Sequence, residues 1–404
     1  MVDLTHAIWW HVYPLGACGA PIRDLDPTDP GWAGHRLPRL EAWLDYAVEL
    51  GCNGLLLGPA FASTSHGYDT VDHFRLDPRL GDEQDWDHFV AAARSRGLQI
   101  MLDGVFNHVG AEHELVTAPG ERAGMVRREG NRHRGWEGHT ALAELDHDDP
   151  RVVDLVAQVM TYWLDCGADG WRLDVAYAVP AHFWAEVLRR VRETHPGACF
   201  LGEVIHGDYV AIAQAGTLDA VTAYEAWKAI WSSLTDRNLW ELAWALERHD
   251  EFSRGTCMQT FVGNHDVSRI ASLVGDDGAA LAATVLMTLP GMPSVYYGDE
   301  QAFRGSKGSA FSADDEIRPT LPERPDQLAP EGWWLYRLYQ ELIALRRRNP
   351  WLSTGSLRVL DKTNTTIAYA VRADGHELVA HLDITGQPWA TLDVDGEQAF
   401  RWSR

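Results

Sequence analysis

Eight short apolar segments, separated by helix-like segments, constrain the fold of this 404-residue chain more than any other feature. Each segment has the length and composition of a buried strand. They begin at Ala7 (AIWWHVY), Gly54 (GLLLG), Leu98 (LQIMLD), Gly170 (GWRLDV), Ala198 (ACFLGE), Leu218 (LDAVTA), Cys257 (CMQTFVG) and Pro293 (PSVYYG). Strands that alternate with helices in this way predict an α/β fold built on a parallel sheet.

Amphipathic helices are predicted between these strands. Apolar residues recur at helical spacing from Leu40 and from Val152, and the second stripe stops before Gly167, a residue type that commonly ends helices. Two further helices are predicted over residues 277–289 and 335–345. Eight strand and helix pairs predict a (β/α)₈ TIM barrel, which needs about 250 residues. An open doubly wound sheet is the structural alternative.

Two segments fall outside this repeat. Residues 109–149 are polar and rich in Gly, His and Arg, and they predict a short inserted B subdomain after the third strand. Residues 350–404 change to short alternating runs separated by turns, which predict a small C-terminal antiparallel β domain, interpreted as a β-sandwich. The barrel is therefore assigned to residues 1–108 and 150–349.

Charge and cysteine content exclude several classes of protein. The net charge of −23 argues against nucleic acid or an anionic membrane as a partner, because both require basic surface. The five cysteines are scattered without CxxC spacing, so neither a disulfide framework nor a structural zinc site is expected. No signal peptide and no apolar run of ~20 residues is visible, so we expect a cytoplasmic protein.

Polar side chains gather where four of the predicted strands end. In a (β/α)₈ barrel, catalytic residues project from the C-terminal ends of the strands. The residues are Asp103, Asn107 and His108 after the third strand, Arg172 and Asp174 after the fourth, Glu203 and His206 after the fifth, and His265 and Asp266 after the seventh. Any one of them alone is weak evidence, since a single carboxylate after a strand is commonly a helix cap. Four such strand ends in barrel order predict one active site.

The same strand ends carry a family resemblance. The stretches DGVFNH, GWRLD, GE and NHD resemble the strand-end motifs of the α-amylase family, glycoside hydrolase family 13, in order and spacing. HGYDTVDHFRLDPRLGD from His66 and GMPSVYYGDE near the last strand match as well. The motifs are most similar to the cyclomaltodextrinase and neopullulanase-like branch, but the N-terminal domain of that branch is not expected within these residues.

The chemistry that the resemblance implies is retaining glycoside hydrolysis, which uses two carboxyl groups ~5–5.5 Å apart. Asp174 is the expected nucleophile, and Arg172, two residues earlier on the same side of the strand, is expected to keep it ionised. Glu203 is the expected acid/base and must carry a proton at rest, which an apolar setting favours. By resemblance, Asp266 is the third catalytic carboxylate.

The remaining site residues are implied by the resemblance alone. His108 and His265 resemble histidines that bind hydroxyls of one glucose, and Tyr68 would stack under its ring beside His66. Asp69 and Arg318 would clamp the far edge of that glucose, with a structural ion pair as the equal alternative. Two further substrate-binding residues are expected, namely Arg172 and His206. Tyr177 stands where the branch usually has Asn, on the leaving-group side.

No cofactor is expected to be required, and a structural calcium ion is left open. By resemblance Asn107 is one calcium ligand, but Ca²⁺ takes ~6–8 oxygen ligands and the sequence shows no clear further set. The predicted partner is a small oligosaccharide, and a homodimer is left open.

The favoured function is hydrolysis of α-1,4 links in short linear or cyclic gluco-oligosaccharides, such as maltodextrins and cyclodextrin-like rings. One alternative is a transglycosylase or isomerase of the same family, trehalose synthase-like or sucrose isomerase-like, which shares the covalent intermediate. The other is a non-catalytic carbohydrate-binding or partner protein, which would be expected to lack one of the three carboxylates.

Overall fold

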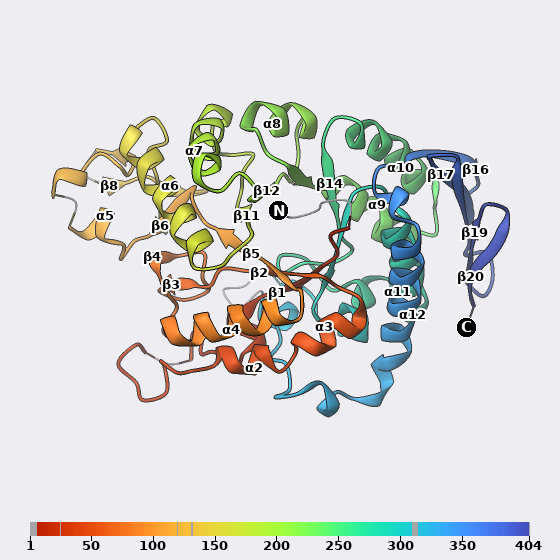
Figure 1. The fold of residues 1–404 in the computed structure, drawn as a ribbon, viewed down its shortest axis with the longest axis horizontal. Coiled ribbons are helices and arrows are strands. Elements are labelled where there is room, and N and C mark those ends of the chain that lie inside the picture. Colours follow the sequence, from red (N-terminus) through yellow and green to blue (C-terminus); the bar gives the residue numbers. More distant parts are fainter. Residues whose placement is uncertain (1–5, 25, 119, 131, 309–313, 404) are drawn as a thin grey trace.

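Eight parallel strands close into a barrel at the centre of the molecule (Figure 1). The structure is a computed structural model, and it describes residues 6–24, 26–118, 120–130, 132–308 and 314–403. In their order around the barrel the strands are β1 (Trp9–Val12), β15 (Met292–Tyr296), β14 (Cys257–Thr260), β13 (Ala220–Thr222), β12 (Cys199–Gly202), β11 (Gly170–Leu173), β5 (Gln99–Gly104) and β2 (Gly54–Leu57). The predicted (β/α)₈ barrel is confirmed, and the open-sheet alternative is wrong.

The barrel interior and the layer outside it are packed by different apolar side chains. Trp9, Leu56, Met101 and Leu201 belong to one small buried cluster inside the ring of strands, whereas most other apolar residues form the large core between strands and helices. A Cβ atom at Gly54 would lie 2.4 Å from the Trp9 ring, so the neighbouring strand needs a glycine there.

Helices surround the barrel on its outside (Figure 1). They are α1 (Pro14–Ala17), α2 (Leu37–Glu41), α3 (Leu44–Leu50), α4 (Glu83–Ser95), α6 (Pro150–Asp165), α7 (Ala181–Thr194), α8 (Tyr209–Gly216), α9 (Tyr224–Thr235), α10 (Trp240–Ser253), α11 (Ile270–Thr288) and α12 (Trp333–Arg348). Short 3₁₀ segments are η1 (Gly120–Arg122), η2 (Asp299–Gln301), η3 (Asp315–Ile317), η4 (Pro325–Gln327), η5 (Pro330–Gly332) and η6 (Pro350–Ser353). The stripe at Leu40 forms two helices, α2 and α3, and α11 is interrupted at Gly275, whose φ is 71°. Among the described residues α11 alone is long and apolar enough to cross a membrane, and 67% of its most apolar window is buried in the protein.

Two small β substructures lie beside the C-terminal end of β5. The antiparallel pair β3 (Phe61–Ser63) and β4 (Thr70–Leu76) was not predicted as a hairpin, and its connecting loop carries residues 64–69. The inserted segment contributes a three-stranded sheet in the order β6 (His108–Gly110), β10 (His139–Glu144), β9 (Gly135–Trp136). It also contains α5 (Glu114–Thr117) and the pair β7 (Arg128–Glu129) and β8 (Arg132–His133).

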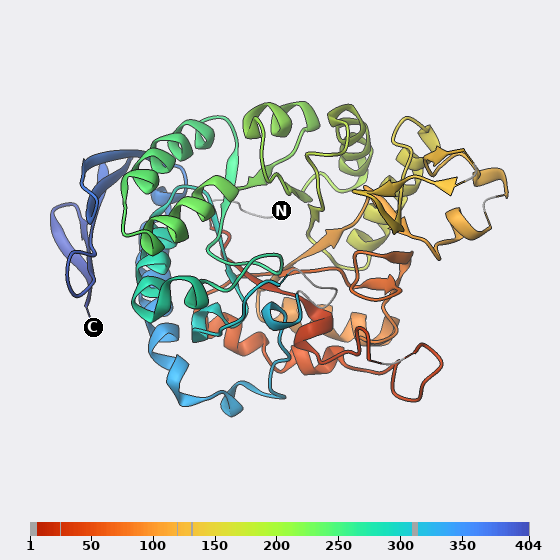
Figure 2. The same cartoon turned by 180° about the vertical axis from the view of Figure 1, so that it is seen from behind.

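The C-terminal segment forms one five-stranded antiparallel sheet at the end of the molecule opposite the insertion (Figure 1, Figure 2). Its strands are β16 (Ser356–Lys362), β17 (Thr366–Ala373), β18 (His376–Asp383), β19 (Trp389–Val394) and β20 (Glu397–Ser403). The two-sheet sandwich expected here is wrong for the described residues. One face of the sheet shares its core with the barrel helices instead, and the Tyr369 hydroxyl bonds Thr288 of α11 at 2.5 Å. Because helices cover the apolar face, a second sheet is not needed.

A buried glutamate follows β15 and gives a prediction for stability. Glu300 is 1% exposed, accepts hydrogen bonds from the Tyr46 hydroxyl (2.8 Å) and the Gly298 amide (2.9 Å), and burial raises its pKa to about 7. The folded chain therefore keeps a proton that the unfolded chain releases at lower pH, so stability is lost as pH rises toward 7. Glu300→Gln should remove this loss. The free energy of unfolding of wild type relative to the variant should fall by about 2–3 kcal/mol between pH 5 and pH 8, measured by urea unfolding. An equal difference at both pH values would contradict the assignment.

Candidate active site

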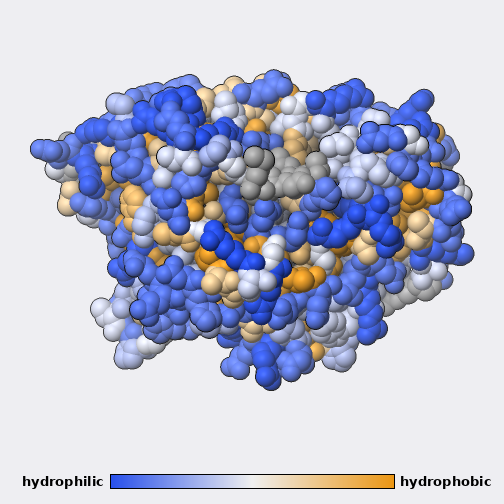
Figure 3. Space-filling model, in the orientation of Figure 1, coloured by the Kyte–Doolittle hydropathy of each residue, from blue (hydrophilic) through white to orange (hydrophobic). Residues whose placement is uncertain are grey.

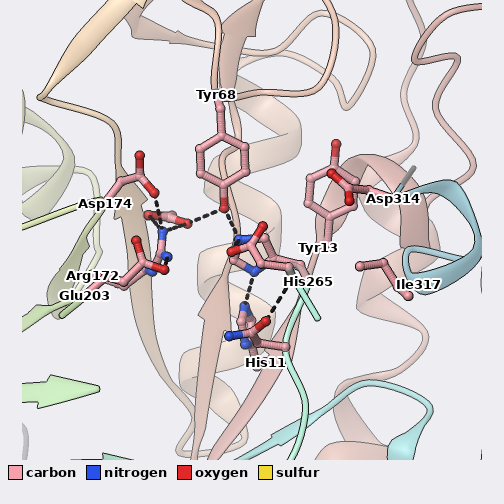
Figure 4. Close-up of polar contacts among 12 residues, drawn as sticks. His11, Tyr13, Tyr68, Arg172, Asp174, Glu203, His265, Asp314 and Ile317 are labelled. Carbon is pink, nitrogen blue, oxygen red and sulfur yellow. Dashed lines mark hydrogen bonds and ion pairs between the residues drawn. The ribbon is translucent and has the colours of Figure 1, made fainter. Parts of the chain in front are cut away.

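The predicted catalytic side chains meet above the C-terminal ends of the barrel strands (Figure 4). Arg172 of β11 is directly opposite Asp103 of β5 in the strand register, so the two side chains share one face. Asp174 follows β11, and Glu203 follows β12. Most of the face seen in Figure 3 is hydrophilic, with apolar patches around its centre.

One guanidinium binds three carboxylates. Nη1 of Arg172 lies 2.6 Å from Oδ2 of Asp103 and 3.0 Å from Oδ1 of Asp174, and its Nη2 lies 2.7 Å from Oε1 of Glu203. All four side chains are 8% exposed or less. Asp174 and Glu203 are therefore held across a single planar group, in a common site as predicted.

Glu203 is surrounded by hydrogen-bond donors. Besides Arg172, its Oε2 accepts from the Val175 amide at 2.9 Å, and its Oε1 accepts from the Tyr224 hydroxyl at 3.1 Å. Asn264 in turn donates to the Tyr224 hydroxyl at 2.9 Å. These contacts fix the carboxyl group of the expected acid/base in one orientation.

Opposing effects act on the carboxyl group of Asp174. Burial raises the pKa of Asp174 well above its usual value, and neighbouring Glu203, Asp103 and Asp266 raise it further, while Arg172 acts in the opposite direction. The single positive charge of Arg172 is shared among several carboxylates, so it does not offset all of these effects. That Asp174 is ionised stays a prediction.

The backbone next to Asp174 is strained. Val175 has φ of 40°, in the left-handed region that β-branched residues rarely adopt, and the amide held in this way is the one that donates to Glu203. The strain predicts an ordering of two variants that both lose the valine side chain. Val175→Gly should be more stable to urea than Val175→Ala by about 1 kcal/mol, because only glycine adopts this φ without cost. An alanine variant of equal or greater stability would contradict the strain.

Asp266 and its neighbours form the other half of the site. Its Oδ1 lies 3.1 Å from Nη2 of Arg318 and its Oδ2 lies 3.0 Å from Nε2 of His265. Burial raises the pKa of Asp266, but His265, Arg318 and Arg172 outweigh burial and leave that pKa well below its usual range. Asp266 is therefore a charged carboxylate, and its side chain is 31% exposed.

The loop between β3 and β4 brings Tyr68 to the same place. Its hydroxyl lies 3.0 Å from Oδ2 of Asp103 and also contacts Nε2 of His265, and the two rings are stacked with centroids 5.4 Å apart. Oδ2 of Asp69 accepts from Ser65, whereas its buried Oδ1 has no hydrogen-bond partner among the described residues. Nδ1 of His66, on the same loop, accepts a hydrogen bond from the Tyr68 amide at 3.2 Å.

The expected Asp69 and Arg318 clamp is not an ion pair between those two residues. Arg318 binds Asp266 and also Asp314, whose Oδ2 is 3.0 Å from Nη2, and it donates from Nε to the carbonyl of His265. Whether sugar hydroxyls fit between Asp69 and Arg318 stays a prediction.

The chain matches the family description "Alpha amylase, catalytic domain" over residues 40–136 and 135–327. It belongs to the α-amylase family. The chain is 28% identical to a cyclomaltodextrinase of Geobacillus thermopakistaniensis over 92% of its own length and 67% of that protein. It is 29% identical to neopullulanase 2 of Thermoactinomyces vulgaris over 87% of its length and 64% of that protein. The chain thus spans about two thirds of the length of these curated relatives, which are of the branch that the motifs predicted.

A solved structure aligns over nearly the whole of this α-amylase family member. It is a cyclic α-maltosyl-(1→6)-maltose hydrolase from Arthrobacter globiformis, in complex with cyclic α-maltosyl-(1→6)-maltose. The TM-score is 0.82 at 26% identity, covering 96% of this chain and 92% of that one. The alignment therefore covers the barrel and most of the appended β sheet.

Two of the predicted substrate-binding histidines, His108 and His206, differ in burial and in partners. His108 uses Nε2 for the Tyr68 carbonyl (3.0 Å) and Nδ1 for the Asn107 amide (3.1 Å), so both ring nitrogens have protein partners. Burial lowers the pKa of His108 to about 4. His206 is exposed, and its ring packs against Tyr177 with centroids 4.9 Å apart.

The described surroundings of Asn107 fit calcium poorly. Its amide bonds His108 and its main-chain carbonyl accepts from the Leu145 amide, and no described contact joins it to a carboxylate. The one described cluster with metal-like spacing, at His35, Asp82 and Asp85, is remote in sequence, and Asp82 and Asp85 already cap α4 there. The proposed reaction uses no metal ion.

Several residues of the site were missed from sequence. His11 at the end of β1 shares a hydrogen bond of 3.1 Å with His265, and burial lowers its pKa well below the usual value. Tyr224 and Asn264 position Glu203, and the Tyr13 ring lies 4.7 Å below the Arg318 guanidinium. His11 lies near the C-terminal end of the first strand and Tyr224 follows the sixth, so the same strand-end rule, applied to all eight strands, would have found them.

Proposed function

We propose that this protein is a retaining α-glycoside hydrolase that cuts α-1,4 links in short linear or cyclic gluco-oligosaccharides. The observation that carries the proposal is the contact of Arg172 with both Asp174 and Glu203, which holds two carboxyl groups from neighbouring strands across one site. Two carboxyl groups placed close together suit a covalent rather than a direct displacement.

The proposed reaction has two steps. Asp174 as carboxylate attacks the anomeric carbon and forms a glycosyl ester, while Glu203 gives its proton to the departing glycosidic oxygen. Glu203, now a carboxylate, takes a proton from water as that water attacks the same carbon, and Asp174 leaves as a carboxylate. The first step requires a proton on Glu203. Substrate oxygens that compete for Arg172 support this requirement, since Glu203 would lose one of the donors that favour its carboxylate form.

The substrate class is inferred from the relatives. Their names include a cyclomaltodextrinase, a neopullulanase and a hydrolase of a cyclic tetrasaccharide. Together they support a compact gluco-oligosaccharide, linear or cyclic, as the substrate of this chain. The net charge of −23 agrees with an uncharged ligand rather than an anionic one.

A substrate panel tests the proposal. Purified protein is incubated with maltotriose, β-cyclodextrin, cyclic α-maltosyl-(1→6)-maltose, pullulan, isomaltose, sucrose and trehalose, and products are resolved by chromatography. Release of glucose or maltose from the first three, with α-anomers formed first by NMR, is the expected result. β-Anomers as first products would exclude the retaining mechanism, and no product from any sugar would favour a non-catalytic binding protein.

The same panel also tests for transfer of the glycosyl group to a second sugar, because hydrolases and transglycosylases share the covalent ester. Tyr177 packs beside His206 near Glu203, where an acceptor sugar would enter, and this supports testing for transfer. Longer oligosaccharides or isomers as main products would favour a transglycosylase or isomerase. The cytoplasmic location and the homodimer stay predictions.

A further inference from the structure

A groove lies on the Glu203 side of the barrel, between the loop after β12 and helices α9 and α10. Its volume is about 530 Å³, within the range of ~300–1,000 Å³ usual for small-molecule sites. Aromatic and charged side chains make up much of the lining. The residues that the argument uses are Ile205, Tyr224, Trp227, Lys228, Trp244 and Arg248.

The groove and the active site have Tyr224 in common. Tyr224 lines it and also donates its hydroxyl to Oε1 of Glu203 at 3.1 Å. Ile205, two residues after Glu203, lines it as well and is 39% exposed. Because Glu203 is the group that protonates the leaving oxygen in the proposed reaction, these two residues place the groove beside the leaving-group side of the site.

Two tryptophan side chains, Trp227 and Trp244, line the groove. Trp244 on α10 is 54% exposed, and the Arg248 guanidinium lies 4.8 Å from the centroid of its ring. Trp227 on α9 is half-buried and stacks on Phe261 with centroids 6.2 Å apart. Exposed indole rings of this kind cover the apolar face of a pyranose ring while leaving its hydroxyls free.

The charges in the groove are paired with one another. Nη2 of Arg248 lies 3.1 Å from Oε2 of Glu225, and Lys228 forms an ion pair with Glu241. A lining of aromatic rings and neutralised ion pairs offers hydrogen-bond partners without a net charge, which suits an uncharged polyol better than an anion or a cation.

We propose that this groove binds the leaving-group end of a longer α-glucan chain, with a glucose ring stacked on Trp244. The inference rests on the proposed function, since it takes Glu203 as the acid/base. It predicts that the enzyme favours long over short linear substrates through contacts several sugar units away from the cut bond.

The kinetic test compares two tryptophans of one helix. Trp240 and Trp244 are both on α10 and are 50% and 54% exposed, but Trp240 is outside the groove lining and bonds Asn364. For Trp244→Ala, the ratio of kcat/KM for maltoheptaose to that for maltotriose should fall about tenfold, the loss of one stacking contact. Trp240→Ala should keep the wild-type ratio. An unchanged ratio in Trp244→Ala, or an equal fall in both variants, would overturn the groove assignment.

A binding test separates failure of the groove from failure of the proposed function. Maltoheptaose affinity is measured by calorimetry for Asp174→Asn and for Asp174→Asn/Trp244→Ala, neither of which needs to turn over. A Kd about tenfold weaker in the double variant supports the groove even if the wild type hydrolyses no sugar. Equal Kd values in the two proteins refute it even if hydrolysis proceeds as proposed.

Discussion

Asp174→Asn is expected to lower kcat on maltotriose and β-cyclodextrin by about 10⁴-fold or more, the effect typical of losing a catalytic nucleophile. The amide has the shape of the carboxyl group and keeps an oxygen for Arg172, but it does not form the glycosyl ester. The wild type and the variant are compared by product release under substrate saturation. Retention of even a tenth of wild-type kcat would contradict the role of Asp174.

Stability separates this loss from misfolding. Burial raises the pKa of Asp174, so a neutral amide removes an unfavourable buried charge and the variant should melt at or above the wild-type temperature. The matched control is Asp45→Asn on α3, where the carboxylate is 70% exposed and pairs with Arg96. This control should keep wild-type kcat, because a surface ion pair contributes little.

Glu203→Gln is expected to lower kcat on maltotriose by about 10²–10⁴-fold, the usual contribution of a general acid. The glutamine keeps the contacts with the Tyr224 hydroxyl and Arg172 through its oxygen, but it has no proton to give to the sugar leaving group. The assay is the rate of maltotriose cleavage by the purified variant at saturating substrate.

A substrate whose leaving group needs no proton separates proton transfer by Glu203 from substrate positioning. An α-glucosyl fluoride releases fluoride without protonation, so the first step of Glu203→Gln on it should approach the wild-type rate. A variant equally impaired on the fluoride and on maltotriose would assign Glu203 to substrate positioning instead of proton transfer.

The barrel was predictable because each of its strands is a short apolar run bounded by turn residues, and local composition is enough to find such runs. The β3 and β4 pair was not predicted because its residues alternate less clearly, with burial that varies along β4. The single C-terminal sheet was mistaken for a sandwich because a sequence shows that a face is apolar but not what covers it. Here the cover comes from helices of the barrel.

The site was predictable to the level of which residues meet. Arg172, Asp174 and Glu203 were predicted to share one site because they lie at strand ends, and parallel strands bring their C-terminal ends to one side. The direction of the pKa shift of Asp174 was not predictable, since it depends on burial and on the nearby charges of Asp103 and Asp266, which come close to Asp174 only in three dimensions. The strain at Val175 was not predictable either, because a valine in the sequence does not indicate a positive φ.

The most direct test of the covalent mechanism is mass spectrometry of Glu203→Gln incubated with an α-glucosyl fluoride. Fluoride departs without acid help, and the variant lacks the base that activates water, so the ester should accumulate. We predict a protein heavier by one glucosyl group, with the added mass on the peptide that contains Asp174. An unmodified protein under conditions in which the wild type hydrolyses the fluoride, or a glucosyl group on any other residue, would contradict the account.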